Sequence, residues 1–130
     1  MIKIKRVYDR IDVRDGMRIL IDGLWPRGVR SSTPNIDMWL KEVAPTSDLR
    51  RWFSHDPSKW QEFRKLYIAE LKANKAMDKL IKLSLENDQI TLLFASKDEE
   101  HNNAVVVLEV LTTMLEKSKP KNKDAKAAKQ

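Results

Sequence analysis

The chain has 130 residues, of which 42% are hydrophobic and 34% charged, so we expect one compact domain with a single core. It contains no cysteine, which excludes disulfide bonds, thiolate metal sites and cysteine nucleophiles, and its two histidines are too few for a histidine-rich metal site. Because no stretch approaches the roughly 20 apolar residues of a membrane helix and no apolar leader opens the chain, we expect a cytoplasmic protein without membrane contact.

The formal net charge of +6 is concentrated at the C-terminal end of the chain. Residues 117–130 contain six lysines and one aspartate, which leaves residues 1–116 close to neutral. The segment has no aromatic or branched apolar residue to bury, so we expect a single domain over residues 1–116 and a disordered lysine-rich tail over residues 117–130. Such a tail could hold nucleic acid weakly and without sequence preference, although a plain solubilising extension is the simpler interpretation.

Two strands are predicted near the N-terminus. Residues 2–8 alternate between apolar and polar side chains, which predicts a strand with one polar face. Residues 18–22 are more continuously apolar, as in a strand covered on both faces. Residues 23–34 contain glycine and proline breaks without periodicity, and they predict a long surface loop.

The middle of the chain is predicted to be helical. Apolar residues at helical spacing predict a short helix over residues 36–43, and Thr46 or Ser47 can cap a second short helix that continues through Phe53. The Asp-Pro pair at residues 56–57 is a strong start signal for a longer helix with an aromatic stripe.

A helix over residues 77–85, a strand over residues 90–95 and a final apolar segment over residues 104–115 complete the pattern. The final segment contains three consecutive valines, which favour a strand, but its length and its apolar spacing favour a helix packed on the sheet.

Strands that alternate with helices of this length are typical of an α/β domain. We expect a small, mostly parallel central sheet of three to four strands flanked by helices. The first connection, of about ten residues, is near the lower limit for a parallel crossover. An antiparallel pairing of the first two strands therefore stays open.

Several unusual segments form a series that resembles one family. They are Arg6-Val7-Tyr8-Asp9, Leu24-Trp25-Pro26-Arg27-Gly28, Ala44-Pro45-Thr46, Leu49-Arg50-Arg51-Trp52-Phe53, and Leu92 to Asp98 leading into Asn102-Asn103-Ala104. Over about residues 2–111 the chain resembles the YeaO-like proteins, part of the domain of unknown function 488. The resemblance implies a small cytoplasmic α/β protein and brings no activity with it.

Three positions depart from that family pattern. Gly23 stands where an arginine is usual, Thr46 where a serine is usual, and Asn103 where a histidine is common. The resemblance therefore implies that any chemistry served by these positions is reduced in this chain.

Ligands of open α/β sheets bind outside the carboxyl ends of parallel strands. Here those ends are residues 22–28 and 96–102, with Tyr8 and Asp9 added if the first strand is parallel. We predict a site with the catalytic candidates Asp22, Lys97 and Asp98 and the ligand contacts Trp25, Arg27, Gly28, Arg50 and Asn102. The two cations Arg27 and Lys97, close to a helix predicted to start near Asp98, favour a phosphate or a carboxylate.

Each candidate also has a plainer structural interpretation. Asp22 and Asp98 could simply cap a loop and a helix, and Trp25 could be a hydrophobic plug. Arg27 could form a structural ion pair with Asp98 or Asp9. The two histidines, at positions 55 and 101, are expected to be loop, capping or exposed residues.

The sequence excludes several enzyme classes. It has no Gly-x-Ser-x-Gly elbow and no phosphate-binding loop of the Walker type, and three glycines cannot form a dinucleotide fingerprint. Asp22 and Asp98 could act as an acid and base pair, or hold a magnesium ion on a bound phosphate. We assign no resident metal or cofactor, and whether the protein is an enzyme stays open.

Three function classes follow. The leading hypothesis is a binding or catalytic site for a small anion or a phosphate-bearing, nucleotide-like ligand at the strand ends. The first alternative is a nucleic-acid accessory protein that uses the lysine tail with Arg27, Arg30, Arg50 and Arg51. The second is a homodimeric interaction module that pairs through the apolar final helix, so both a monomer and a homodimer remain possible.

Overall fold

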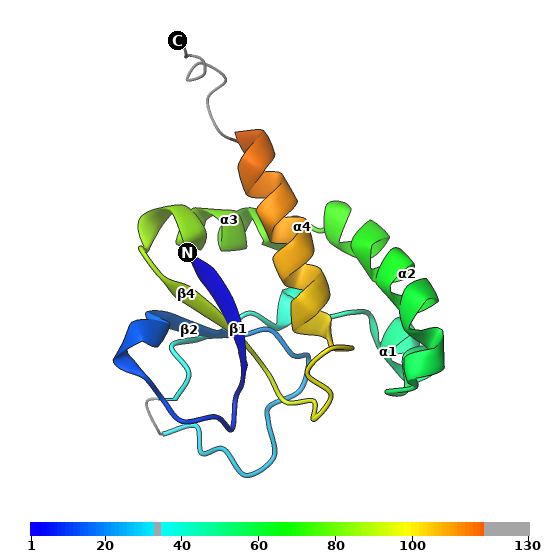
Figure 1. The fold of residues 1–130 in the computed structure, drawn as a ribbon, viewed down its shortest axis with the longest axis horizontal. Coiled ribbons are helices and arrows are strands. Elements are labelled where there is room, and N and C mark those ends of the chain that lie inside the picture. Colours follow the sequence, from blue (N-terminus) through cyan, green and yellow to red (C-terminus); the bar gives the residue numbers. More distant parts are fainter. Residues whose placement is uncertain (33–34, 119–130) are drawn as a thin grey trace.

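The computed structural model describes residues 1–32 and 35–118, and their strands form one parallel sheet in the order β1-β4-β2-β3 (Figure 1). The strands are β1 (Ile2–Arg6), β2 (Met17–Leu20), β3 (Met38–Trp39) and β4 (Ile90–Phe94). Because every pair is parallel, all the carboxyl ends lie at one edge of the sheet. The α/β class and the mostly parallel sheet predicted from the sequence are confirmed.

The first two strands are not neighbours, because β4 lies between them. Ile4 of β1 and Ile19 of β2 both pair with Leu92 of β4. The short connection over residues 7–16 therefore crosses one strand and returns in parallel, helped by a turn of 3-10 helix at Val13–Asp15. This arrangement resolves the open question of strand direction in favour of a parallel crossover.

The two faces of the sheet are covered differently. On one face, Ile4, Ile19 and Leu92 belong to the main hydrophobic core. On the other face, Leu20 and Leu93 pack with Val7 in a smaller cluster. The alternation of side chains along each strand produces this division, as the sequence pattern of the first strand predicts.

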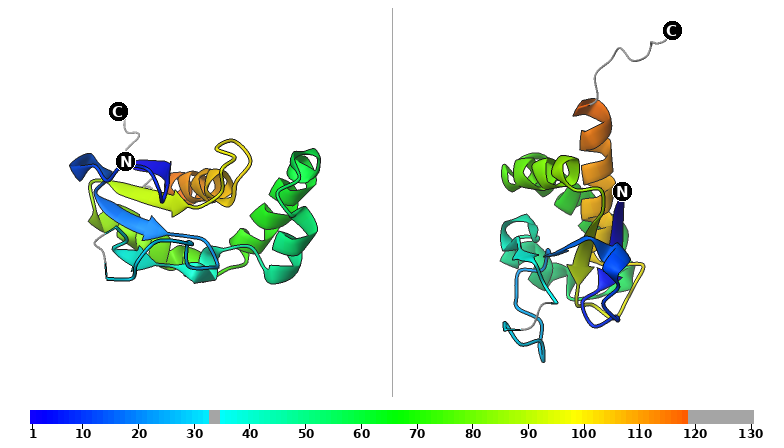
Figure 2. Two further views of the ribbon diagram at one scale, coloured as in Figure 1. Left: turned by 90° about the horizontal axis from the view of Figure 1, so that it is seen from below. Right: turned by 90° about the vertical axis from the view of Figure 1, so that its left-hand side faces the viewer.

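The helices are α1 (Ser47–Phe53), α2 (Trp60–Lys72), α3 (Ala76–Glu86) and α4 (Asn103–Ser118). Their buried residues all belong to the main core, so the helices pack on one face of the sheet, while loop residues cover the smaller cluster. In Figure 2, α1 and α2 stand beyond the carboxyl ends of the strands. This placement gives the pocket described below its far wall.

The prediction of a short helix over residues 36–43 is wrong. Residues 38–39 form β3, and only Lys41–Val43 makes a turn of 3-10 helix. The Leu40 N–H donates to the Leu20 carbonyl at 2.8 Å, and the Asp37 N–H donates to the Arg18 carbonyl at 2.8 Å. Pairing with β2 satisfies backbone groups that a short isolated helix would leave free.

The final helix is confirmed and is longer than predicted. α4 includes Lys117 and Ser118, the first two residues assigned to the disordered tail. The rest of that predicted tail, residues 119–130, lies outside the described residues. Within the described ranges, no helix combines the length and the apolar character needed to span a bilayer.

Candidate functional site

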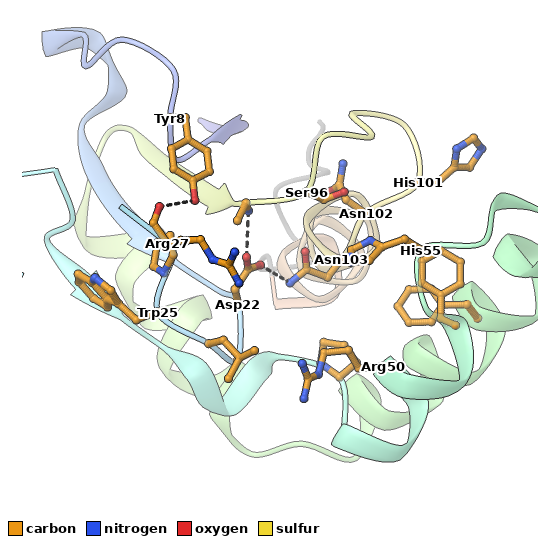
Figure 3. A pocket seen from close by; sticks show the side chains of 17 residues that line it. Tyr8, Asp22, Trp25, Arg27, Arg50, His55, Ser96, His101, Asn102 and Asn103 are labelled. Carbon is orange, nitrogen blue, oxygen red and sulfur yellow. Dashed lines mark hydrogen bonds between the residues drawn. The ribbon is translucent and has the colours of Figure 1, made fainter. Parts of the chain in front are cut away.

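A pocket of about 550 Å³ opens at the carboxyl ends of β1, β2 and β4. The residues that follow these strands form its near side, and α1, α2 and the start of α4 form the remaining walls (Figure 3). The volume is in the range of small-molecule sites. A pocket therefore lies at the edge of the sheet where the strand-end rule predicts a ligand site.

Asp22 lies at the floor of the pocket and ties three segments together. Its carboxylate accepts one hydrogen bond from the Ala95 N–H at 2.9 Å and another from Asn103 Nδ2 at 3.0 Å (Figure 3). Burial raises the pKa of Asp22 above its usual range, while these two hydrogen bonds and the nearby His55 oppose the increase. Both carboxylate oxygens are thus occupied in holding β2, β4 and α4 together.

The loop after β2 forms one wall. Trp25 packs edge-on against Trp39, with ring centroids 5.3 Å apart, and its indole N–H donates to the Val29 carbonyl at 2.6 Å. The Tyr8 hydroxyl, from the end of β1, donates to the Arg27 carbonyl at 2.8 Å. These contacts fix the backbone of the loop and leave the Arg27 side chain exposed at the pocket.

The opposite wall comes from α1 and the turn that ends it. Thr46 caps α1 by accepting from the Leu49 N–H at 3.3 Å, which sets the direction of the helix. Arg50 and Phe53, one helical turn apart, both line the pocket. After α1 the backbone takes left-handed values at Ser54 and His55 (φ 46° and 57°), and His55 also lines the pocket.

The segment that leads into α4 forms the third wall. Asn102 Oδ1 accepts from the Val105 N–H at 3.1 Å and so caps α4, while Asn102 Nδ2 donates to the Asp98 carbonyl at 2.9 Å. His101 Nδ1 lies 2.9 Å from Asp98 Oδ2. Hydrogen bonds from the Glu100 N–H and from His101 lower the pKa of Asp98. The Asp98 carboxylate thus connects the residues of this turn.

Two cationic side chains face the pocket from different walls. Arg27 extends from the loop after β2, and Arg50 extends from α1 (Figure 3). Within the described part of the chain, neither guanidinium has a hydrogen bond or an ion pair, and Asp22 is the one carboxylate among the lining residues. The expected alternative, a structural pairing of Arg27 with Asp9 or Asp98, does not occur among these residues.

The structure brings together five of the eight predicted site residues. They are Asp22, Trp25, Arg27, Arg50 and Asn102. Gly28, Lys97 and Asp98 do not line the pocket. The expected helix start near Asp98 is also wrong, because α4 begins at Asn103. Directly after β4, Ala95 and Ser96 reach the pocket; the chain then turns outward at the exposed Lys97 and returns to the pocket at His101.

Sequence reasoning assigned no site role to several lining residues. Among these, His55, Ser96, His101 and Asn103 carry polar groups. Ser96 and His101 fall inside the strand-end segment 96–102, so their place in that segment could have indicated that they line the pocket. No local pattern points to His55, because its position depends on how α1 packs beyond the sheet. Over residues 1–32 and 35–118, no three His, Asp or Glu side chains converge as a metal site would require.

The fold and the pocket define a small α/β protein with a strand-end pocket of mixed cationic and aromatic lining. The chain belongs to the family described as the inactive DUF488-N3 subclade, whose model matches residues 1–129. The family resemblance seen in the sequence motifs is thereby confirmed.

Relatives from two bacterial genera support the assignment. The uncharacterised protein YeaO of Escherichia coli is 35% identical over 113 residues, covering 87% of this chain and 98% of its own. An uncharacterised protein of Mycobacterium tuberculosis is 34% identical over 110 residues, covering 85% of this chain and 92% of its own. The comparison with solved structures found no match.

Proposed function

We propose that the strand-end pocket is a non-catalytic binding site for a small anionic molecule bearing a phosphate or a carboxylate. The observation that carries the proposal is the pair Arg27 and Arg50, which line one pocket from different walls. Guanidinium groups bind such anions through charge-assisted, often bidentate hydrogen bonds. Among the described residues, no carboxylate lies close enough to either guanidinium to form an ion pair with it.

Binding without turnover is supported by the state of the candidate catalytic groups. The Asp22 carboxylate is engaged by Ala95 and Asn103, and Lys97 and Asp98 lie outside the pocket. The matching family is itself described as inactive. A cytoplasmic location is part of this proposal, because phosphorylated and carboxylated small molecules are abundant there, and cell fractionation would test it.

Calorimetric titration of the full chain with ribose 5-phosphate tests the proposal. We expect saturable binding that weakens about tenfold in Arg27→Ala and in Arg50→Ala, which corresponds to about 1.4 kcal/mol for each lost charge-assisted contact. Ligand at 100 times its dissociation constant should raise the free energy of unfolding by about 2.7 kcal/mol.

Arg51→Ala is the matched control. Arg51 is the next residue of α1, is exposed, and pairs with Asp48 at 2.6 Å instead of lining the pocket. We expect this variant to bind like the wild type. An equal loss of affinity in Arg51→Ala, or unchanged affinity in the Arg27→Ala/Arg50→Ala double variant, would show that the pocket is not the anion site.

A further inference from the structure

A cluster of aromatic rings fills the space between α1 and α2. Phe53 and Phe63 are stacked, with centroids 4.2 Å apart and planes 22° apart, and Tyr67 continues the cluster 5.5 Å from Phe63. All three rings are buried. The α1–α2 side of the pocket is therefore a rigid aromatic wall and not a mobile surface.

Two imidazole rings adjoin this cluster at the edge of the pocket. The ring of His55 lies 6.4 Å from Phe53, and the ring of His101 packs edge-on against Trp60 at 5.3 Å. His55 is exposed and His101 is half-buried, and both line the pocket. The aromatic wall thus ends in two planar side chains that retain accessible surface.

The two imidazoles are positioned by different features of the chain. The left-handed backbone at Ser54 and His55 is uncommon outside glycine, and it places the His55 ring next to Phe53. The ring of His101 is oriented by Asp98, whose carboxylate is fixed in turn by backbone N–H groups. The His101 side chain therefore has little freedom left to lose when a planar ligand packs against it.

The cationic and aromatic parts of the pocket lie on different sides. In Figure 3, Arg27 projects from the side opposite to His55 and His101, and Arg50 projects from the base of α1. A ligand that contacts both parts needs an anionic group and a planar ring joined by a short spacer. Nucleoside 5′-monophosphates have this chemistry.

We propose, on the basis of the anion-binding function above, that the ligand is a nucleoside 5′-monophosphate. Its phosphate binds Arg27 and Arg50, and its base packs against His55 and His101. Stacking on planar side chains tolerates any base, because every base offers a π face. The inference therefore concerns the class of nucleotide and not one particular base.

Calorimetry with three probes separates this inference from the function on which it rests. We expect AMP and CMP to bind at least tenfold more tightly than ribose 5-phosphate. In the His55→Ala/His101→Ala double variant this advantage should disappear, while the affinity for ribose 5-phosphate stays at the wild-type value. The double variant with phenylalanine at both positions should recover most of the advantage, because a planar ring is restored.

Trp52→Ala is the control for loss of an aromatic side chain from α1. Its ring is exposed, lies under Lys59 Nζ at 5.2 Å and does not line the pocket, so nucleotide affinity should not change. Thermal unfolding of each variant verifies that it is folded.

Equal affinity for AMP and ribose 5-phosphate would overturn the nucleotide inference and leave the anion site intact. An AMP advantage that survives removal of both imidazoles would also overturn it. Failure of every probe to bind would overturn the anion site itself.

Discussion

Asp15 is a fully buried carboxylate at the amino ends of the strands, surrounded by three cations. Lys3 Nζ lies 2.9 Å and Lys5 Nζ 3.0 Å from its oxygens, and the buried Arg18 also donates to it. Burial alone would raise the pKa of Asp15, but the hydrogen bonds from these cations outweigh it and hold the pKa well below its usual range. The ionised form is therefore the one that stabilises the fold.

We predict that Asp15→Asn lowers the free energy of unfolding by about 3 kcal/mol at pH 7, because Arg18 is left buried beside a neutral amide. A native pKa below the unfolded value of about 3.9 means that this stabilisation is complete above about pH 5. It is lost as the pH falls towards the native pKa. Urea unfolding of both proteins between pH 7 and pH 3 measures this difference, which should shrink with acidification. A difference that is independent of pH would contradict the account.

Gly16 has a backbone conformation and a neighbour that together exclude a side chain. Its φ is +65°, and an added Cβ would lie 2.1 Å from the Gln89 carbonyl oxygen. Gly28 also has a positive φ, +82°, but an added Cβ there meets no atom within 4 Å. Comparing alanine substitutions at the two glycines therefore separates the cost of backbone strain from the cost of a steric clash.

We predict that Gly28→Ala costs about 1 kcal/mol of stability, from the left-handed conformation alone. Gly16→Ala should cost roughly 3 kcal/mol or more of stability. There the strain of the backbone adds to the cost of displacing Gln89, the residue before β4. Chemical denaturation of the two variants tests the difference. Equal losses of stability in the two variants would contradict this account, because they would mean that the segment before β4 can shift at little cost.

At the residue scale, the sequence could identify the charged and aromatic residues at strand ends but not their orientation. Asp22 and Arg27 lie in the segment that follows β2, and both line the pocket. Lys97 lies in the segment that follows β4, but it is exposed outside the pocket. The difference depends on how the turn after Ser96 is hydrogen-bonded, which is a tertiary property. The same limit applies to His55, whose backbone conformation no sequence pattern indicates.

Among the elements, α1 shows how local signals and tertiary contacts combine. Thr46 caps the helix, and its hydroxyl and N–H also donate to the Glu70 carboxylate of α2 at 2.7 and 3.0 Å. The capping residue could be predicted, because threonine before an apolar stripe is a frequent N-cap. The contact with Glu70 could not, because it depends on the angle between α1 and α2.

We predict that Thr46→Ala lowers the free energy of unfolding by about 1 kcal/mol, through loss of the cap. The same variant should weaken anion binding, because Arg50 is carried by α1. Thr46→Ser keeps both the cap and the hydroxyl donor, and it should restore stability and binding. Denaturation and calorimetry of the two variants provide the test. A serine variant as weak as the alanine variant would indicate that the threonine methyl group is the important part.

β3 shows where the prediction of elements fails. Two residues are too few to display a period of two, and the surrounding apolar residues happen to have helical spacing. Longer elements were predicted correctly because their patterns extend over several turns or a whole strand. The buried strand β4 and the long helix α4 are examples.

At the scale of the whole molecule, the pocket exists because of the strand order. The order β1-β4-β2-β3 places the ends of β1, β4 and β2 side by side, so Tyr8, Ser96 and Asp22 reach one pocket from distant parts of the sequence. A mostly parallel sheet could be predicted from the alternation of strands and helices, while the direction of the first strand stayed open. The order of the strands could not, because the short crossover after β1 allowed more than one pairing.

The position of α1 and α2 beyond the strand ends is also a property of the whole molecule. The aromatic side chains of these helices are expected in the core; Phe53 and Phe63 are indeed buried, whereas Trp52 is exposed, against that expectation. The Phe53 and Phe63 rings also line the pocket. The sequence could not indicate this second role, because it depends on the packing of α2 against α4.

The most direct test of the anion site is amide chemical-shift mapping of the full ¹⁵N-labelled chain during titration with ribose 5-phosphate. We predict saturable shifts in three separate segments, residues 23–27, 50–55 and 95–103, with little change in α3. Shifts confined to residues 117–130, or spread evenly over the basic surface, would contradict a shared pocket at the strand ends.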